Sequence, residues 1–311
     1  MLLKYIKVPL LLPIRSTAIR SSSVDLGVDK VTFRAQAASA PAAGNKTTTG
    51  TFPSVSLPSF TGGLSVDVSL VAQLGHGGGS SLFSSVIHRQ RQHSLFVDEL
   101  DEPSAKLASC DFTKGDSTSV YTFAVGARGH PFHRHEGHRV FVAISGSSGA
   151  RLRFCSVSPS ELEKDPNLFL QRLRQVEIPP DCLFSVRFGG ETWHQFLPLD
   201  ARSGQPAFVA LSVHTNELGG NLSDELKQQV INGEASIPSL TQLLPAAVTA
   251  QLAAIAPDSL SVPTTRLRLD APSESILAQA CQLARVNAGR LRGAWTTASP
   301  LGMPGFQEGW G

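Results

Sequence analysis

The chain has 311 residues, a formal net charge of +2 and 41% hydrophobic residues, enough to bury one core domain with appendages. Its basic residues are scattered, so composition gives no electrostatic footprint for nucleic-acid binding. We also expect no membrane-spanning helix, because no run of about 18 apolar residues occurs.

Residues 1–90 are expected to be mostly a disordered extension or linker. Residues 35–66 consist largely of Ala, Thr, Ser, Gly and Pro, and they carry almost no charge. The first acidic residue, Asp25, follows a basic, serine-containing segment that resembles a transit peptide. We expect a cytoplasmic protein, with N-terminal organelle targeting as the alternative.

From Leu95 onward, short runs rich in β-branched and aromatic residues alternate with Gly, Pro and polar clusters. Repeated short strands separated by turns are typical of a β-sandwich or barrel. We therefore expect a β domain over residues 91–217. The predicted strands cover residues 107–112, 120–125, 140–144, 151–155, 183–188 and 208–213.

Helices are predicted at two places. One helix is inserted in the β domain, starting at Ser158-Pro159 and continuing from Asn167 to Val176. After residue 217 the pattern becomes helical, with Ser223 as an N-cap, Gly233 as a stop, and further helices near residues 245–255 and from Pro272. Residues 218–311 are therefore expected to form a helical C-terminal region.

Histidines carry the strongest chemical signal. Four of the nine histidines fall within residues 130–138, just before an apolar run. Because alternate residues of a strand share a face, His133 and His135 are expected to point the same way. His194 follows a second apolar run far along the chain. Imidazole is a common ligand of transition metals, so three converging histidines would make a metal site.

These features resemble the cupin family. The pair His133-Arg134-His135, followed by a strand and Gly146, is similar to the first cupin motif. Residues 180–194, which end in Gly189-Gly190 and then His194, are similar to the second. The resemblance covers residues 95–217 and implies a mainly β fold, the double-stranded β-helix or cupin jelly-roll barrel, here with an inserted helix and a helical C-terminal region.

The resemblance implies that His133, His135 and His194 hold a divalent metal. Arg139 takes the position of the family's glutamate, so the set is three neutral histidines, as in some cupins that include thiol dioxygenases. Fe(II) is the first choice of metal, with Zn, Mn or Ni as alternatives. Arg139 could clamp an anionic substrate, or its charge could prevent metal binding.

The implied function is a mononuclear non-haem iron oxygenase that acts on a small anionic organic substrate. The alternatives are a non-catalytic ligand-binding or sensor module, and a metal-dependent isomerase or lyase. A small-molecule substrate is the expected partner, and a homodimer is one option for assembly. Further residues expected near the cavity are His138, His214, Glu136 and Arg187.

Overall fold

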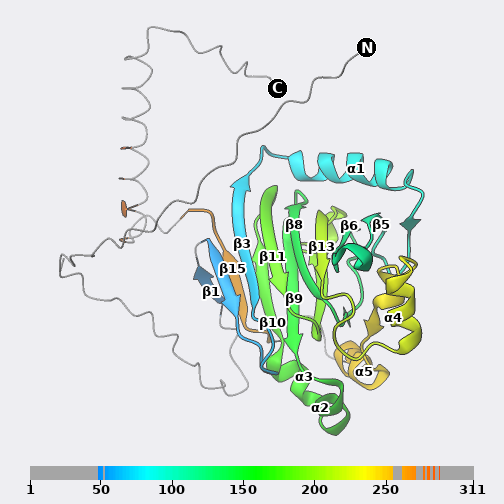
Figure 1. The fold of residues 1–311 in the computed structure, drawn as a ribbon. Helices are drawn as coiled ribbons and strands as arrows, with labels where there is room; N and C mark the ends of the chain where they lie inside the picture. The colour runs from blue at the N-terminus through cyan, green and yellow to red at the C-terminus, as the bar shows by residue number, and fades with distance from the viewer. Residues whose placement is uncertain are drawn as a thin grey trace, which may run out of the picture. The chain divides into compact units, whose positions relative to one another are not determined.

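The computed structural model describes residues 48–51, 53–254 and 261–270, together with isolated positions between residues 276 and 287. These residues belong to a compact unit, Gly44–Gly311, built on two β-sheets (Figure 1). Within the part of the chain that is described, no helix is long and apolar enough to cross a membrane.

The order of the strands in each sheet is as follows. The first sheet runs β1 (Thr48–Thr51), β15 (Thr264–Leu267), β10 (Arg174–Ile178), β9 (Ala150–Ser156), β12 (Thr192–Pro198), β7 (His133–Arg134) and β14 (Gln242–Leu243). The second sheet runs β2 (Ser54–Leu57), β3 (Val66–Gln73), β11 (Cys182–Phe188), β8 (His138–Ser145), β13 (Phe208–Thr215), β6 (Ser119–Val125), β5 (Ser104–Ala108) and β4 (Phe96–Val97).

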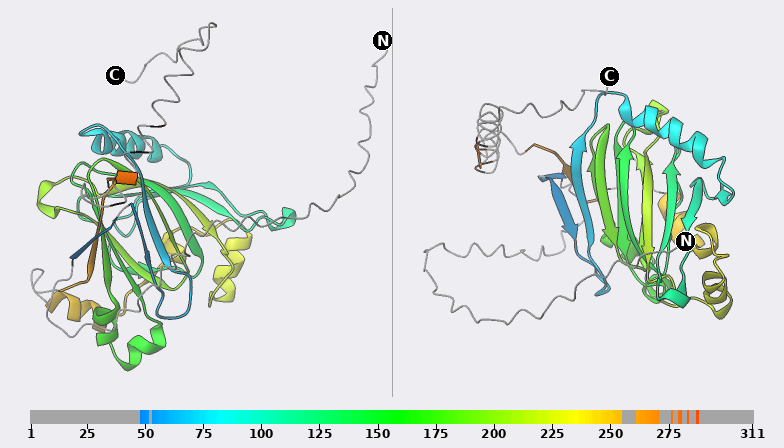
Figure 2. Two further views of the ribbon diagram at one scale, coloured as in Figure 1. Left: turned by 90° about the vertical axis from the view of Figure 1, so that its left-hand side faces the viewer. Right: turned by 45° about the horizontal axis from the view of Figure 1, so that its top comes forward.

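The helices lie around these sheets, and α1 runs along one end of the second sheet (Figures 1 and 2). The α-helices are α1 (Gly78–Gln90), α2 (Pro159–Lys164), α3 (Asn167–Arg172), α4 (Asp224–Ile231) and α5 (Ala246–Ala254). The short 3-10 helices are η1 (Phe112–Lys114), η2 (Ala201–Ser203) and η3 (Pro238–Leu240).

Eight central strands, β6 to β13, define the topology. They occur in the order β11-β8-β13-β6 in one sheet and β10-β9-β12-β7 in the other. The chain therefore changes sheet at every step except between β9 and β10. This is the strand order of a jelly roll with two Greek keys. The predicted double-stranded β-helix is confirmed.

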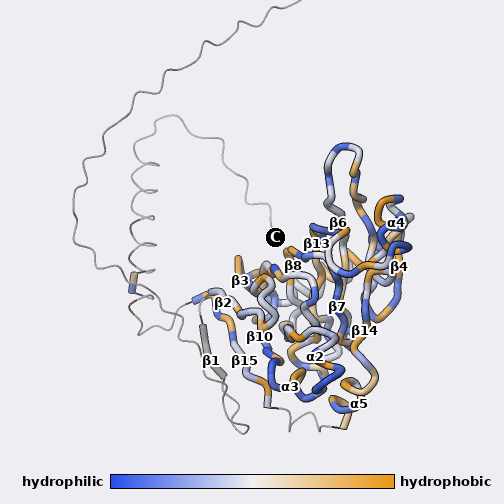
Figure 3. The backbone as a smooth tube through the Cα atoms, turned by 60° about the horizontal axis from the view of Figure 1, so that its bottom comes forward, coloured by the Kyte–Doolittle hydropathy of each residue, from blue (hydrophilic) through white to orange (hydrophobic). Residues whose placement is uncertain are grey.

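The core combines buried residues from both sheets. Hydrophobic and hydrophilic residues are interspersed along the chain (Figure 3). In β11, Phe184, Val186 and Phe188 are buried, whereas Arg187 is exposed. Phenylalanines dominate this core, and the rings of Phe123 and Phe141 meet edge to face with centroids 5.3 Å apart. Such aromatic pairs stabilise a core by roughly 0.5–1.5 kcal/mol beyond the burial of their surface.

The inserted helical segment differs from the prediction. The capping box at Ser158 starts α2, and α3 begins at Asn167, but α3 ends at Arg172 instead of continuing to Val176. Residues 174–178 form β10, which pairs with β9 on one side and β15 on the other. The prediction of a helix up to Val176 was therefore wrong. The apolar residues have helical spacing, but the backbone of this segment pairs with strands on both sides.

Ordered elements begin inside the segment expected to be mostly linker. β3 and α1 occupy residues 66–73 and 78–90, and β3 extends the second sheet beside β11. The alternation of Val66, Val68 and Leu70 with polar residues is a readable strand signal. Residues 1–47 lie outside the described residues.

The C-terminal region contributes to the first sheet as well as forming helices. β14 pairs with β7, and β15 pairs with β10. Helices α4 and α5 begin close to the predicted positions. Of the helix expected from Pro272, only isolated positions are described, and these are helical.

Candidate metal centre

Three histidines converge on one point inside the barrel. His133 on β7 is paired directly with His194 on β12, and His135 follows two residues after His133. The three side chains each offer one nitrogen, and these nitrogens lie within 4.8 Å of one another. All three residues are buried, with exposures of 0–6%. Strand pairing and the two-residue alternation together produce this cluster.

Each of these imidazoles is oriented through its Nδ1 atom. The Nδ1 atoms of His133, His135 and His194 lie 3.1, 3.2 and 3.0 Å from backbone carbonyl oxygens of Pro131, Leu240 and Thr192 respectively. A carbonyl oxygen can only accept, so each Nδ1 carries the hydrogen and donates it. The Nε2 lone pairs therefore stay available, as in proteins that hold metals through histidine.

The electrostatics favour neutral imidazoles. Burial, and after it the charge of Arg139, holds the pKa of His135 well below its usual range. Burial lowers the pKa of His194 to about 3, and it holds that of His133 well below normal. In addition, the Nε2 atom of His133 is buried without a hydrogen-bond partner among the described residues. A neutral, oriented donor set of this kind fits a divalent metal.

His130 lies beside this cluster, with its ring centroid 4.6 Å from that of His133, and one ligand atom each of His130, His133 and Glu102 lie within 4.8 Å of one another. Its Nδ1 atom lies 2.9 Å from the carbonyl oxygen of Pro131, and its Nε2 atom accepts the backbone N–H of Phe196 at 3.2 Å. Both nitrogens are therefore used, and His130 fixes the loop that precedes β7.

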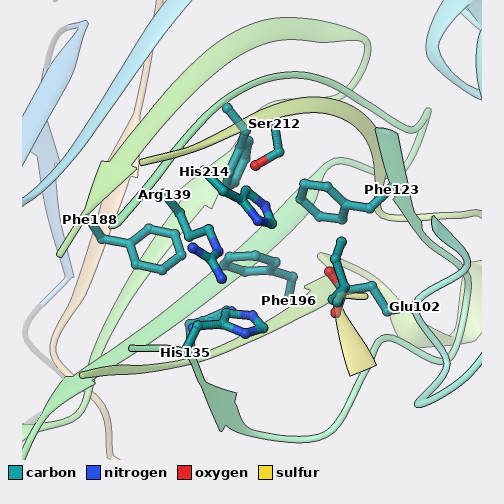
Figure 4. Close-up of a pocket in the computed structure, with 11 residues that line it drawn as sticks. Glu102, Phe123, His135, Arg139, Phe188, Phe196, Ser212 and His214 are labelled. Atoms are coloured by element: carbon teal, nitrogen blue, oxygen red, sulfur yellow. The ribbon is translucent and has the colours of Figure 1, made fainter. Parts of the chain in front are cut away.

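A small cavity adjoins the histidines, with a volume of about 20 Å³. Polar residues and phenylalanines line it, among them Glu102, His135, Arg139, Ser212 and His214 (Figure 4). A volume of this size holds about one water molecule. The cavity therefore suits an ion and a very small ligand group.

No protein-family model and no curated protein matches the chain. Solved structures with a similar fold include a cupin 2 domain-containing protein from Halorhodospira halophila, with 16% identity over 51% of this chain and 80% of that chain and a TM-score of 0.29. Another is a variant of oxalate decarboxylase from Bacillus subtilis, with 12% identity over 59% of this chain and 39% of that chain and a TM-score of 0.31. A cupin-2 domain from Rhodospirillum rubrum has 16% identity over 63% of this chain and 90% of that chain, with a TM-score of 0.27.

The similarity to these structures is low, so the fold assignment depends on the jelly-roll strand order of the chain itself. The chain has a jelly-roll fold. The turn before β12 is shaped by Gly190, because a Cβ atom there would lie 1.8 Å from the carbonyl oxygen of Glu136. The glycine lets the strand of His194 approach the segment of His133 and His135 closely.

Arg139 lines the cavity but does not carry an unbalanced charge. Its Nη1 atom donates to Glu217 Oε1 at 3.1 Å, and both residues are buried. His214 stacks on Tyr121, with its Nδ1 atom 3.4 Å from the same carboxylate oxygen. The Nε atom of Arg139 has no hydrogen-bond partner among the described residues.

Glu102 and Ser212 are polar cavity residues that sequence reasoning missed, and Glu102 lies nearest to the histidines. Its Oε2 atom lies 3.5 Å from the Nε2 atom of His133, and its side chain is 7% exposed. Burial raises the pKa of Glu102 to about 8, although the charge of Arg139 opposes this shift. The residue precedes Pro103 in a turn far from both histidine motifs, and nothing in its local sequence distinguishes it.

The other residues expected near the cavity lie at different places. His214 lines it, but His138 accepts the backbone N–H of Gly190 at 3.0 Å and does not reach the cavity. Glu136 accepts from Arg134 at 2.9 Å. Arg187 pairs with Asp67 at the surface, because the alternation of β11 points it away from the core.

Proposed function

We propose that this protein is a mononuclear metal enzyme in which His133, His135 and His194 hold one divalent ion, with Fe(II) as the first candidate. When bound, Fe(II) supplies a site where O₂ and a substrate can bind together. The reaction would be an oxygenation of a small anionic organic substrate. The observation that carries this proposal is the set of three neutral, buried imidazoles with their Nε2 lone pairs free.

Unpartnered polar atoms around the cavity support a small anionic ligand. The Nε atom of Arg139 and the Oγ atom of Ser212 are both buried and lack partners among the described residues. Buried polar atoms of this kind usually serve a ligand, an ion or a water molecule. An N–H donor and a hydroxyl suit a carboxylate or another oxyanion. Arg139 would therefore orient the substrate by a hydrogen bond, while its own charge stays paired with Glu217.

The size of the cavity limits the part of the substrate that reaches the metal. A larger cleft of about 410 Å³ has Ile237 among its lining residues, and Ile237 also lines the small cavity. Lys106 and Tyr121 line this cleft, together with residues 233–236. In the proposed function, the reactive end of the substrate enters the small cavity, and the remainder occupies the cleft.

The test is the metal content of protein purified without chelators, compared with the double variant His133→Ala/His135→Ala. We expect about one equivalent of metal in the wild type, which is lost in the variant. Oxygen uptake by the iron-loaded protein with a panel of small carboxylic acids then tests the oxygenase reaction. Metal without oxygen uptake would favour an isomerase or lyase, and a folded protein that binds no metal would leave a ligand-binding module.

A further inference from the structure

We infer that Glu102 is a fourth protein ligand of the metal ion and takes over the role that the usual cupin glutamate position, occupied here by Arg139, cannot fill. This inference rests on the proposed metal centre. It assigns to that centre a carboxylate that comes from the turn before β5 and not from either histidine motif.

Distance and position support this role. The Oε2 atom of Glu102 lies 3.5 Å from the Nε2 atom of His133. Neighbouring ligands that are each bound at about 2.0–2.2 Å to one ion lie roughly 3–3.5 Å apart, whether the site has four or more positions. Glu102 also lines the same cavity as His135 and His194, on the side opposite Arg139 in Figure 4. Its carboxylate makes no hydrogen bond to any of the described residues, and one of its oxygens lies within 4.8 Å of a ring nitrogen of His133 and of His130.

The charges around the cavity also support Glu102 as a ligand. Three neutral imidazoles leave the full charge of a divalent ion in a buried site. The charge of Arg139 is balanced by Glu217, so neither residue offsets the ion. An isolated buried charge is costly, and one carboxylate ligand halves the net charge of a site that holds a divalent ion. Glu102 is the buried carboxylate that contacts a predicted ligand directly.

The backbone holds Glu102 in this place. Leu100 and Asp101 both adopt positive φ angles, of 56° and 57°, and the turn is closed by the N–H of Glu102 donating to the carbonyl of Glu99 at 3.0 Å. Immediately afterwards, the carbonyl of Pro103 accepts from Ala124 at 2.9 Å, which joins the chain to β6. Ser104 then pairs with Phe123, a core residue, so the chain is fixed to the second sheet two residues after Glu102.

The experiment is a titration of the full chain with Co(II), in competition with a chelator of known affinity and with the visible absorption of Co(II) as a second readout. The variant is Glu102→Gln, which keeps the shape of the side chain. We expect it to raise the Kd for Co(II) by at least about 10- to 100-fold and to change the Co(II) spectrum. The matched control, Glu136→Gln, removes a carboxylate next to His135 that lies outside the cavity, and its Kd should stay within about twofold of the wild-type value.

The outcomes separate this inference from the metal centre itself. Unchanged Kd and spectrum in Glu102→Gln, with Co(II) binding lost in His133→Ala/His135→Ala, would overturn the role of Glu102 and leave the three-histidine centre standing. A wild-type protein that binds no Co(II) would overturn both. Glu102→Asp keeps the charge but shortens the side chain, so an affinity between those of the wild type and Glu102→Gln would support ligation even if the Gln variant unfolds.

Discussion

The Nδ1 atom of His135 lies 3.2 Å from the carbonyl oxygen of Leu240, which is 105 positions further along the chain. Leu240 is buried in a small apolar cluster with Leu222 and Val230, outside the main core. A segment beyond the eight central strands therefore orients one of the three imidazoles. Hydrogen bonds of this kind, made by the second nitrogen of a metal-binding histidine, commonly change metal affinity by about 10- to 100-fold.

Replacing Leu240 by Ala is expected to weaken metal binding without touching a ligand. The truncation loosens the segment that carries the carbonyl group, and it should cost about 2–5 kcal/mol of stability. We expect the Kd for Co(II) to rise about 10-fold. Leu222→Ala is the control, because it removes a similar side chain from the same cluster but carries no carbonyl bonded to His135. Equal Kd values in the two variants would contradict the role of Leu240.

The histidine cluster could be predicted from sequence because its geometry is local. His133 and His135 share a face by alternation, and His194 follows a strand in the order that the cupin motifs imply. Glu102 and the carbonyl of Leu240 could not be predicted in this way. They reach the site through a turn before β5 and through the segment after α4, and their placement depends on tertiary packing.

Local patterns also failed where pairing between strands decides the structure. Residues 174–178 carry apolar residues at helical spacing, but pairing with β9 and β15 makes them a strand. Arg139 was expected at the cavity and lies there, yet its partner Glu217 could not be recognised. Glu217 follows β13, and it is brought to Arg139 by the pairing of β13 with β8.

The stability of the metal-free protein should depend on pH through His214. Burial, followed by the charge of Arg139, lowers the pKa of His214 to about 4, although Glu217 opposes this. Between this value and about 6.5, the unfolded chain binds a proton that the folded chain does not, so stability rises with pH. The contribution of neutral His214 to the free energy of unfolding is complete above about pH 6.5. It is lost as pH falls toward the folded-state pKa, at about 1.4 kcal/mol per pH unit.

Urea unfolding of the wild type and His214→Phe, both freed of metal, checks this prediction. Phenylalanine keeps a ring stacked on Tyr121 but cannot titrate. Between pH 6.5 and 5, the wild type should lose about 2 kcal/mol more stability than the variant. Parallel stability curves over this range would show that His214 is not proton-linked to folding.

Asp181 is expected to stabilise the junction between α1 and β11. Its carboxylate accepts from the backbone N–H groups of Gly77 and Gly79 at 3.0 and 2.8 Å, and from the hydroxyl of Ser147 at 2.8 Å. Burial alone would raise the pKa of Asp181, but these bonds lower it. The stabilisation is therefore present above the ordinary pKa of an aspartate and is lost as pH falls below it.

The backbone of Asp181 has a φ angle of +50°. Two variants distinguish the effect of losing the carboxylate from the effect of this backbone conformation on stability. Asp181→Ala should lower the free energy of unfolding by about 2–4 kcal/mol, through lost hydrogen bonds and a strained φ. Asp181→Gly loses the same bonds but tolerates the φ angle, so it should be about 1 kcal/mol more stable than the alanine variant. Neither should change the Kd for Co(II), and a change would mean that α1 is coupled to the metal centre.

Ile237 is expected to control passage between the cleft and the metal, because it lines both spaces and is only 4% exposed. Ile237→Ala should therefore speed the removal of Co(II) by a small chelator severalfold, measured by stopped-flow absorption. Ile178→Ala is the control, because Ile178 is fully buried in the same core but lines neither space. Both variants should lose about 2–5 kcal/mol of stability, so general loosening of the barrel would raise both rates equally. A rate that rises in Ile237→Ala alone would identify the cleft as the route to the metal, and equal rates would exclude it.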